Sequence, residues 1–140
     1  MSIKEIQDEI VDEFSMFDDW MQRYEYIIEL GKNLPLIEEA AKTDDNLIKG
    51  CQSKVWLQGQ QKEDKIVFTA DSDAILTKGI IAILIRAFSN QKPADILNAE
   101  MDFIGEIGLK EHLSPTRANG LVSMIKNIKM YALAFDAKNN

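Results

Sequence analysis

The chain has 140 residues, of which 46% are hydrophobic and 28% are charged, as in an ordinary globular domain. Sixteen basic against 23 acidic residues leave a net charge of −7. Such a surface repels phosphate backbones, so the composition disfavours a nucleic-acid partner. No apolar run reaches the roughly 18 residues of a membrane span, and the first residues lack the pattern of a signal peptide. We therefore expect a single domain over residues 1–140 that works in the cytoplasm, where thiols stay reduced.

The first helix is predicted by a capping box, in which Ser2 begins the helix and Glu5 lies three residues later. The spacing of the apolar residues that follow predicts a helix with one buried face. These residues are Ile3, Ile6, Ile10, Val11 and Phe14.

A second helix is predicted to begin at Trp20, with Asp18 or Asp19 as its cap. Gly31 follows an apolar stripe and is placed to end this helix. A turn then leads into residues 36–42, where we expect one short helix.

Three strands are predicted in the middle of the chain. Residues 47–49, 53–61 and 65–70 read as strands, because apolar and more polar residues alternate in the longer two. Residues 61–64 would form the hairpin turn between them. The pattern therefore indicates a small antiparallel sheet of about three strands.

Helices are predicted for the rest of the chain. Residues 71–73, Asp-Ser-Asp, would close the sheet and cap a strongly apolar helix over residues 74–88. Pro93 suits the first position of a short helix that ends near Asn98.

Ser114 and Pro115 would begin the last helix. Helices that follow and precede a small antiparallel sheet indicate an α+β fold, with the helices packed against one face of the sheet. The predicted buried stripe of the last helix is Leu121, Val122, Ile125, Ile128, Tyr131, Ala132 and Phe135.

Cys51 is the one cysteine of the chain, and it lies on a turn before a strand. A lone cysteine is more often a small buried hydrophobe than a nucleophile. Here Gly50 permits a positive φ that can present the sulfur away from the core, and Lys49 and Lys54 would favour the thiolate. A single thiol excludes a dithiol relay, a thiolate zinc site and a self-contained cysteine-ligated cluster.

His112 is the one histidine, and a hydrolase would need it as the base for Cys51. A half-buried histidine beside a helix cap is the simpler interpretation. The acidic runs at 18–19 and 71–73 are explained as helix caps, so no metal site is expected. No phosphate loop or dinucleotide motif is present, so no cofactor-binding residue is expected.

Arg117 is predicted in the first turn of the last helix, where a cation is unfavourable toward the helix dipole. A charge against its local preference suggests another task, such as holding a carboxylate or a loop carbonyl. A solvated arginine is an equally good interpretation at this stage.

Four blocks of the sequence, in order, resemble those of the SufE family of sulfur acceptors, and together they extend over nearly the whole chain. Lys54 and Ile80 depart from the residues expected there, and neither changes the pattern. The blocks are Asp19-Trp20 with Arg23-Tyr24 and residues 30–35, then Gly50-Cys51-Gln52-Ser53-Lys54-Val55-Trp56, then Ser72-Asp73-Ala74 with residues 78–82, and finally residues 113–121.

The resemblance implies a function. SufE-like proteins accept sulfur from the persulfide of a pyridoxal-phosphate cysteine desulfurase, carry it as a cysteine persulfide and deliver it to the Suf scaffold complex for iron–sulfur assembly. They also raise the turnover of the desulfurase. By resemblance, Cys51 is the persulfide acceptor, the partners are SufS-like and SufBCD-like proteins, and the pyridoxal phosphate belongs to the partner. The implied fold is related to that of the IscU scaffold.

The resemblance also implies that the free protein packs the thiol inward and that docking of a partner turns it out. We expect Gly50, Gln52 and Ser53 to form the moving loop, and Asp73 and Arg117 to lie near it and hold it. Such a protein is a sulfurtransferase-like accessory carrier rather than a stand-alone enzyme. The alternatives are a CsdE-type carrier for another desulfurase, a desulfurase activator that carries no sulfur, and a thiol hydrolase.

Overall fold

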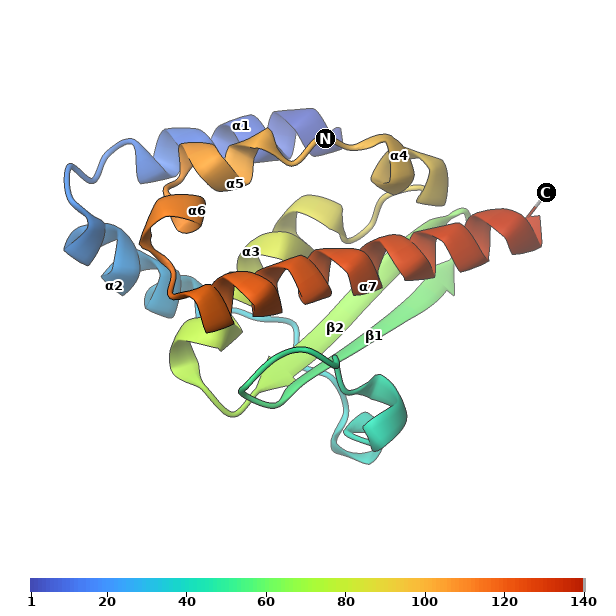
Figure 1. Ribbon diagram of the computed structural model, residues 1–140. Helices are drawn as coiled ribbons and strands as arrows, with labels where there is room; N and C mark the ends of the chain where they lie inside the picture. Colours follow the sequence, from blue (N-terminus) through green and yellow to red (C-terminus); the bar gives the residue numbers. More distant parts are fainter. Residues whose placement is uncertain (140) are drawn as a thin grey trace.

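The computed structural model describes residues 1–139 and confirms an α+β fold, in which helices pack against one face of a two-stranded antiparallel sheet (Figure 1). No helix within these residues is both long and apolar enough to cross a membrane. The elements are α1 (Ile3–Phe14), α2 (Trp20–Gly31), two 3-10 turns (Glu39–Ala41 and Asp44–Asn46), β1 (Val55–Lys62), β2 (Lys65–Ser72), α3 (Ile75–Phe88), α4 (Pro93–Asn98), α5 (Asp102–Glu106), α6 (Leu109–His112) and α7 (Pro115–Asn139).

The sheet is a hairpin whose register runs from Val55 opposite Ser72 to Lys62 opposite Lys65. Alternate residues of both strands are buried, as the sequence pattern predicted. The prediction of a third strand at 47–49 is wrong, because Leu47 makes only an isolated bridge to Trp56. The chain turns away at Gly50, which has a φ of 95°, and this stops the pairing after one bridge.

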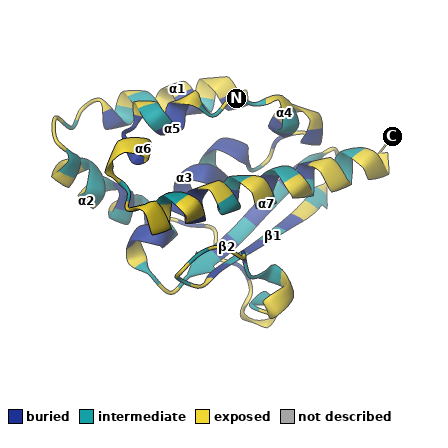
Figure 2. Cartoon of the chain, in the orientation of Figure 1, coloured by how far each residue is buried: buried dark blue, intermediate teal, exposed yellow. Residues whose placement is uncertain are grey.

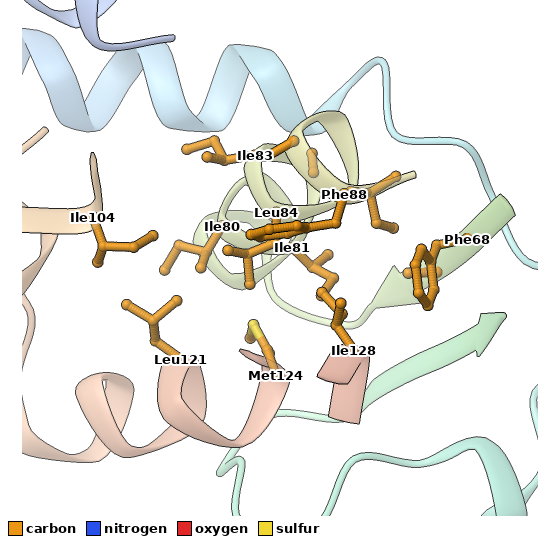
Figure 3. Close-up of a cluster of buried hydrophobic side chains, with 14 of the residues drawn as sticks. Phe68, Ile80, Ile81, Ile83, Leu84, Phe88, Ile104, Leu121, Met124 and Ile128 are labelled. Atoms are coloured by element: carbon orange, nitrogen blue, oxygen red, sulfur yellow. The ribbon is translucent and has the colours of Figure 1, made fainter. Parts of the chain in front are cut away.

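Helix α3 lies at the centre of the molecule, and most of its residues are buried (Figures 2 and 3). It packs between α2, β2 and α7. The prediction that residues 71–73 cap this helix is wrong, since the N-cap is Ala74 and no side chain bonds to the first turn. Ser72 instead accepts a hydrogen bond from the Ala74 N–H at 3.2 Å. Burial on all sides explains why the helix is apolar around its whole circumference.

The capping box of α1 is confirmed, with reciprocal hydrogen bonds between Ser2 and Glu5 at 3.0 and 3.1 Å. The cap of α2 is Asp19, whose carboxylate accepts the Gln22 N–H at 2.9 Å. The helix predicted at 36–42 is limited to one short 3-10 turn.

Gly31 ends α2 as predicted, but for another reason. It is a helical residue, and the cap that follows it, Lys32, keeps a right-handed conformation. A Cβ at Gly31 would lie 2.9 Å from the backbone nitrogen of Gly79 in α3, and a Cβ at Gly79 would lie 2.1 Å from the Ile27 carbonyl oxygen. The two glycines therefore let α2 and α3 cross with their backbones in contact.

A cluster of charges joins the first three helices around Arg86 of α3. Its guanidinium donates to Glu13 and to Glu9 of α1, each at 2.7 Å. Tyr26 of α2 donates to Glu13 as well. Hydrogen bonding to Arg86 lowers the pKa of Glu13, while burial and then the hydrogen bond to Glu13 raise the pKa of Tyr26 to about 12.

The C-terminal helices agree in part with the prediction. Helix α4 has the predicted bounds, and Ser114 caps α7 by accepting the Arg117 N–H at 3.3 Å. The prediction that Val122 belongs to the buried stripe of α7 is wrong, because the residue is 62% exposed. Its neighbour Leu121 is buried. Helices α5 and α6 were not predicted, since each has five residues or fewer and shows no periodicity.

Candidate functional site

A pocket of about 280 Å³ lies beside Cys51, where three segments meet. The loop before β1 contributes residues 51–53, and the first turns of α3 contribute Thr77 and Ile80. The start of α7 and the residue before it supply the remaining wall, which consists of Ser114, Thr116, Arg117, Gly120 and Met124. In Figure 1 this loop passes close to the first half of α7.

The loop rests on α7 through two glycines. Gly50 has the left-handed φ of 95°, as its position before Cys51 suggested, and a Cβ on it would lie 2.5 Å from the Ser123 hydroxyl oxygen. A Cβ on Gly120 would lie 3.3 Å from the sulfur of Cys51. Since Gly120 and Ser123 are one turn apart on α7, the loop lies flat against a single helix face.

The thiol of Cys51 points toward α7 rather than away from the core. Its S–H donates to the Gly120 carbonyl oxygen at 3.6 Å, and the side chain is half-buried against the core. The expectation that Gly50 presents the sulfur outward is therefore corrected for this state. The inward packing that the family resemblance implied describes it instead.

The expectation that Lys49 and Lys54 favour the thiolate of Cys51 is also corrected. Burial raises the pKa of the Cys51 thiol, and neither lysine offsets that effect. Burial disfavours the charged form, and a thiol that donates a hydrogen bond to a carbonyl must keep its proton. The resting cysteine is therefore a weak nucleophile.

Asp73 joins the end of the loop to the start of α3. Its carboxylate accepts the Lys54 N–H at 3.0 Å, and its own N–H donates to the Lys54 carbonyl at 3.2 Å. This pair of bonds fixes the point at which the loop enters β1. A second hollow, of about 450 Å³, is lined by residues 47–54 and Asp44.

The other residues predicted for the site, Gln52 and Ser53 of the loop and Arg117 of α7, lie at the wall of the pocket. Gln52 and Arg117 are exposed, and Ser53 is half-buried. Within residues 1–139 the Arg117 guanidinium forms no ion pair, and the bond that involves Arg117 uses its backbone N–H. Arg117 is thus placed near the loop, and its role in holding the loop stays a prediction.

The structure does not bring His112 to the pocket. Its ring stacks on Trp20, with centroids 4.6 Å apart and an angle of 11° between the planes. His112 is absent from the wall around Cys51, so the geometry gives the thiol no base of this kind.

Thr77 and Gly120 belong to the site and were not singled out from the sequence. A glycine inside a helix costs about 1 kcal/mol and often marks a close packing contact, which was the available signal for Gly120. Thr77 interrupts the apolar run of α3, and only the fold reveals that it faces the pocket.

Residues 1–139 contain no group of three or more potential metal-binding side chains.

The sequence matches one protein family along most of its length. The SufE family, described as an Fe-S metabolism associated domain, matches residues 8–132. An uncharacterised SufE-like protein of Rhizobium meliloti (strain 1021) is 44% identical over 130 residues, which are 89% of this chain and 93% of the relative. SufE-like protein 1, chloroplastic/mitochondrial, of Arabidopsis thaliana is 37% identical over 93% of this chain and only 35% of its own length.

The fold is shared with a solved structure of much lower sequence similarity. The solution structure of a hypothetical protein from Thermus thermophilus has a TM-score of 0.78 and 14% identity, and the match covers 94% of this chain and 96% of that one. At this identity the likeness concerns the arrangement of helices and strands alone.

Proposed function

This chain belongs to the SufE family, and we propose that it is a sulfur acceptor that carries one sulfur atom as a persulfide on Cys51. The observation that carries the proposal is the placement of the one thiol at the wall of a polar pocket, on a loop held by few contacts. The family as a whole is associated with iron–sulfur metabolism, which supplies the use for such a sulfur atom.

The transfer step is a thiol exchange. The Cys51 thiolate attacks the outer sulfur of the donor's persulfide, so a new S–S bond forms to Cys51. The S–S bond of the donor breaks, and its electron pair leaves on the donor's cysteine. The proton lost from Cys51 balances the charge, and no separate oxidant or reductant is consumed.

The resting state keeps the acceptor weakly reactive. The raised pKa of Cys51 and its hydrogen bond to Gly120 both favour the protonated thiol. A donor that docks must therefore draw the loop away from α7. The two hollows that the loop lines leave room for Gly50, Cys51 and Ser53 to move without disturbing the core. With no second thiol in the chain, a loaded persulfide is safe from internal attack.

The donor in this proposal is a SufS-like cysteine desulfurase in the cytoplasm, which holds the pyridoxal phosphate itself. The recipient is a SufBCD-like scaffold on which iron–sulfur clusters are assembled. Arg117, exposed at the wall of the pocket, is available to meet the incoming partner. Asp73 keeps the end of the loop in place while the middle moves.

The test is intact-mass analysis of the protein after incubation with a cysteine desulfurase and free cysteine, with Cys51→Ser in parallel. We expect the wild type alone to gain the mass of one or more sulfur atoms, and a reductant to reverse the gain. If neither protein gains mass while desulfurase turnover rises with both, the protein is an activator that carries no sulfur. Turnover assays with two desulfurases separate a SufS-type from a CsdE-type carrier.

A further inference from the structure

We propose that Thr77 of α3 binds the carried sulfur, by donating a hydrogen bond from its hydroxyl to the outer sulfur of the Cys51 persulfide. This inference rests on the proposed carrier function and assigns one residue to the protection of the cargo. It starts from a feature that the fold alone does not require, namely a hydroxyl among the apolar side chains of the central helix.

The first observation is the burial of Thr77. Its side chain lines the pocket beside Cys51, yet the residue is only 7% exposed. The other hydroxyls of the wall are more open to water, since Ser114 and Thr116 are exposed and Ser53 is half-buried. None of the side-chain hydrogen bonds formed within residues 1–139 involves the Thr77 hydroxyl. No fully buried side-chain oxygen or nitrogen within residues 1–139 lacks a partner, so this unpaired hydroxyl is reached from the pocket, where it is a ready donor to a ligand.

The second observation is the end of α3 that carries Thr77. The N-cap Ala74 offers no side chain to the first turn, so the N–H groups of that turn stay free of a side-chain cap. The positive end of the helix dipole therefore faces the side of the pocket where Thr77 lies. Both the hydroxyl and the dipole favour a negatively charged atom over a neutral one.

Loading of Cys51 creates such an atom. In the free protein the S–H of Cys51 donates to the Gly120 carbonyl. In the persulfide this sulfur has no hydrogen, so the bond to Gly120 is lost and the side chain is released from α7. The outer sulfur, which lies about 2 Å further out, carries either the proton or, because a persulfide is more acidic than a thiol, the negative charge. A pocket of about 280 Å³ has ample room for it.

Protection follows from the same contact. A small thiol discharges the carrier by attacking the outer sulfur, forming its own S–S bond while the electron pair leaves on the Cys51 sulfur. A hydrogen bond to the buried outer sulfur stabilises the loaded state and covers the atom that is attacked. Thr77 should therefore lengthen the lifetime of the persulfide and leave the unloaded thiol unaffected.

The experiment loads Cys51 without any partner protein, so that its result is independent of the desulfurase. The mixed disulfide of Cys51 with a small aromatic thiol is formed, and sodium sulfide then displaces the aromatic thiol to leave the persulfide. The loss of one sulfur atom in dithiothreitol is followed by intact-mass analysis for the wild type, Thr77→Val, Thr77→Ser, Thr116→Val and Thr69→Val. Valine has the shape of threonine without its hydroxyl, serine restores the hydroxyl, and Thr69 lies on β2 away from the pocket.

We expect Thr77→Val to shorten the lifetime of the persulfide at least about tenfold, the size of one hydrogen bond to a charged acceptor. The persulfide of Thr77→Ser and of Thr69→Val should live as long as that of the wild type. Thr116→Val should shorten the lifetime much less than Thr77→Val does. Alkylation of the unloaded Cys51 should proceed at one rate in all five proteins.

Other results overturn the inference. A wild-type lifetime in Thr77→Val shows that the hydroxyl does not bind the sulfur. A lifetime in Thr77→Ser as short as in Thr77→Val assigns the effect to packing of the methyl group. Faster alkylation of unloaded Thr77→Val, in proportion to its faster discharge, shows a loosened loop instead. Failure of the desulfurase to load the wild type, with the chemically loaded variants as expected, would refute the proposed donor and leave the role of Thr77 intact.

Discussion

Glycines bring two pairs of segments into close contact, and the contacts differ in what an added side chain would meet. At the crossing of α2 and α3, a Cβ on Gly79 would collide with the backbone of Ile27. At the cysteine loop, the atom nearest to a Cβ on Gly120 would be the sulfur of Cys51, and the atom nearest to one on Gly50 would be the hydroxyl oxygen of Ser123. Backbone in a packed helix cannot yield, whereas the end of a side chain can.

The surroundings of the two contacts differ in the same direction. Near the helix crossing, Arg86 joins α1 to α3 and Tyr26 packs on Phe14 with ring centroids 5.1 Å apart. The loop, by contrast, lines two hollows and is tied at its end by the two bonds between Asp73 and Lys54. The molecule therefore has a rigid helical base and a lightly held acceptor loop, which suits a carrier whose thiol must change its exposure.

The largest effect is expected for Gly79→Ala. The new methyl group has no space against the Ile27 carbonyl, so α2 and α3 must separate, at a cost of about 3 kcal/mol or more of unfolding free energy. Urea denaturation would measure it. The matched control is Gly105→Ala in α5, where a Cβ meets only the Lys110 side chain at 3.5 Å and stability should not fall. Equal stability of the two variants would contradict a rigid crossing.

A smaller loss of about 2 kcal/mol is expected for Arg86→Gln, because the half-buried Glu13 loses its charged partner and keeps only the hydrogen bond from Tyr26. The pKa of Glu13 is lowered in the folded state, so the contribution is present at neutral pH and is lost as the pH falls below the ordinary value of 4.5. The difference between the two proteins should therefore shrink in acid. Lys32→Gln, which breaks an exposed pair with Glu29, should change stability little. If the difference in unfolding free energy between the wild type and Arg86→Gln stays constant down to pH 2, it does not come from the pairing of Arg86 with ionised Glu13.

At the loop, Gly120→Ala should alter the thiol and spare the fold. The methyl group would push the Cys51 sulfur from α7, and alkylation by iodoacetamide should rise by about three- to tenfold as its pKa falls toward the ordinary value of 9.0. Stability should be unchanged or up to about 1 kcal/mol higher, because alanine favours the helix. Unfolding and alkylation are measured on the same samples. A loss of stability as large as that of Gly79→Ala would remove the distinction between the two contacts.

The smallest effect is expected for Asp73→Ala. The Lys54 N–H loses its acceptor at an exposed site, which should cost about 0.5–1 kcal/mol and raise Cys51 alkylation by about twofold. Asp73→Asn retains an oxygen acceptor and should lie near the wild type. If Cys51 is alkylated at the wild-type rate in both variants, the bond between Asp73 and Lys54 does not hold the loop. Arg117→Ala is then the next variant to examine.

Much of the local structure could be predicted from the sequence. The capping box at Ser2, the start of α7 after Ser114 and the alternation in β1 and β2 depend on neighbouring residues alone. The positive φ of Gly50 was likewise expected from its place in a turn. These features follow from backbone preferences and side-chain periodicity that act over a few residues.

Only the tertiary structure decided the environment of Cys51. The residues next to Cys51 suggested an outward thiol activated by two lysines, and only the family resemblance implied an inward one. The fold turns the thiol onto Gly120, 69 residues further along the chain, and burial raises its pKa. The roles of Gly79 and Thr77 were hidden for the same reason. Burial, close backbone contact and the lining of a pocket are properties of segments that meet in space, and residue type and spacing along the chain do not encode them directly.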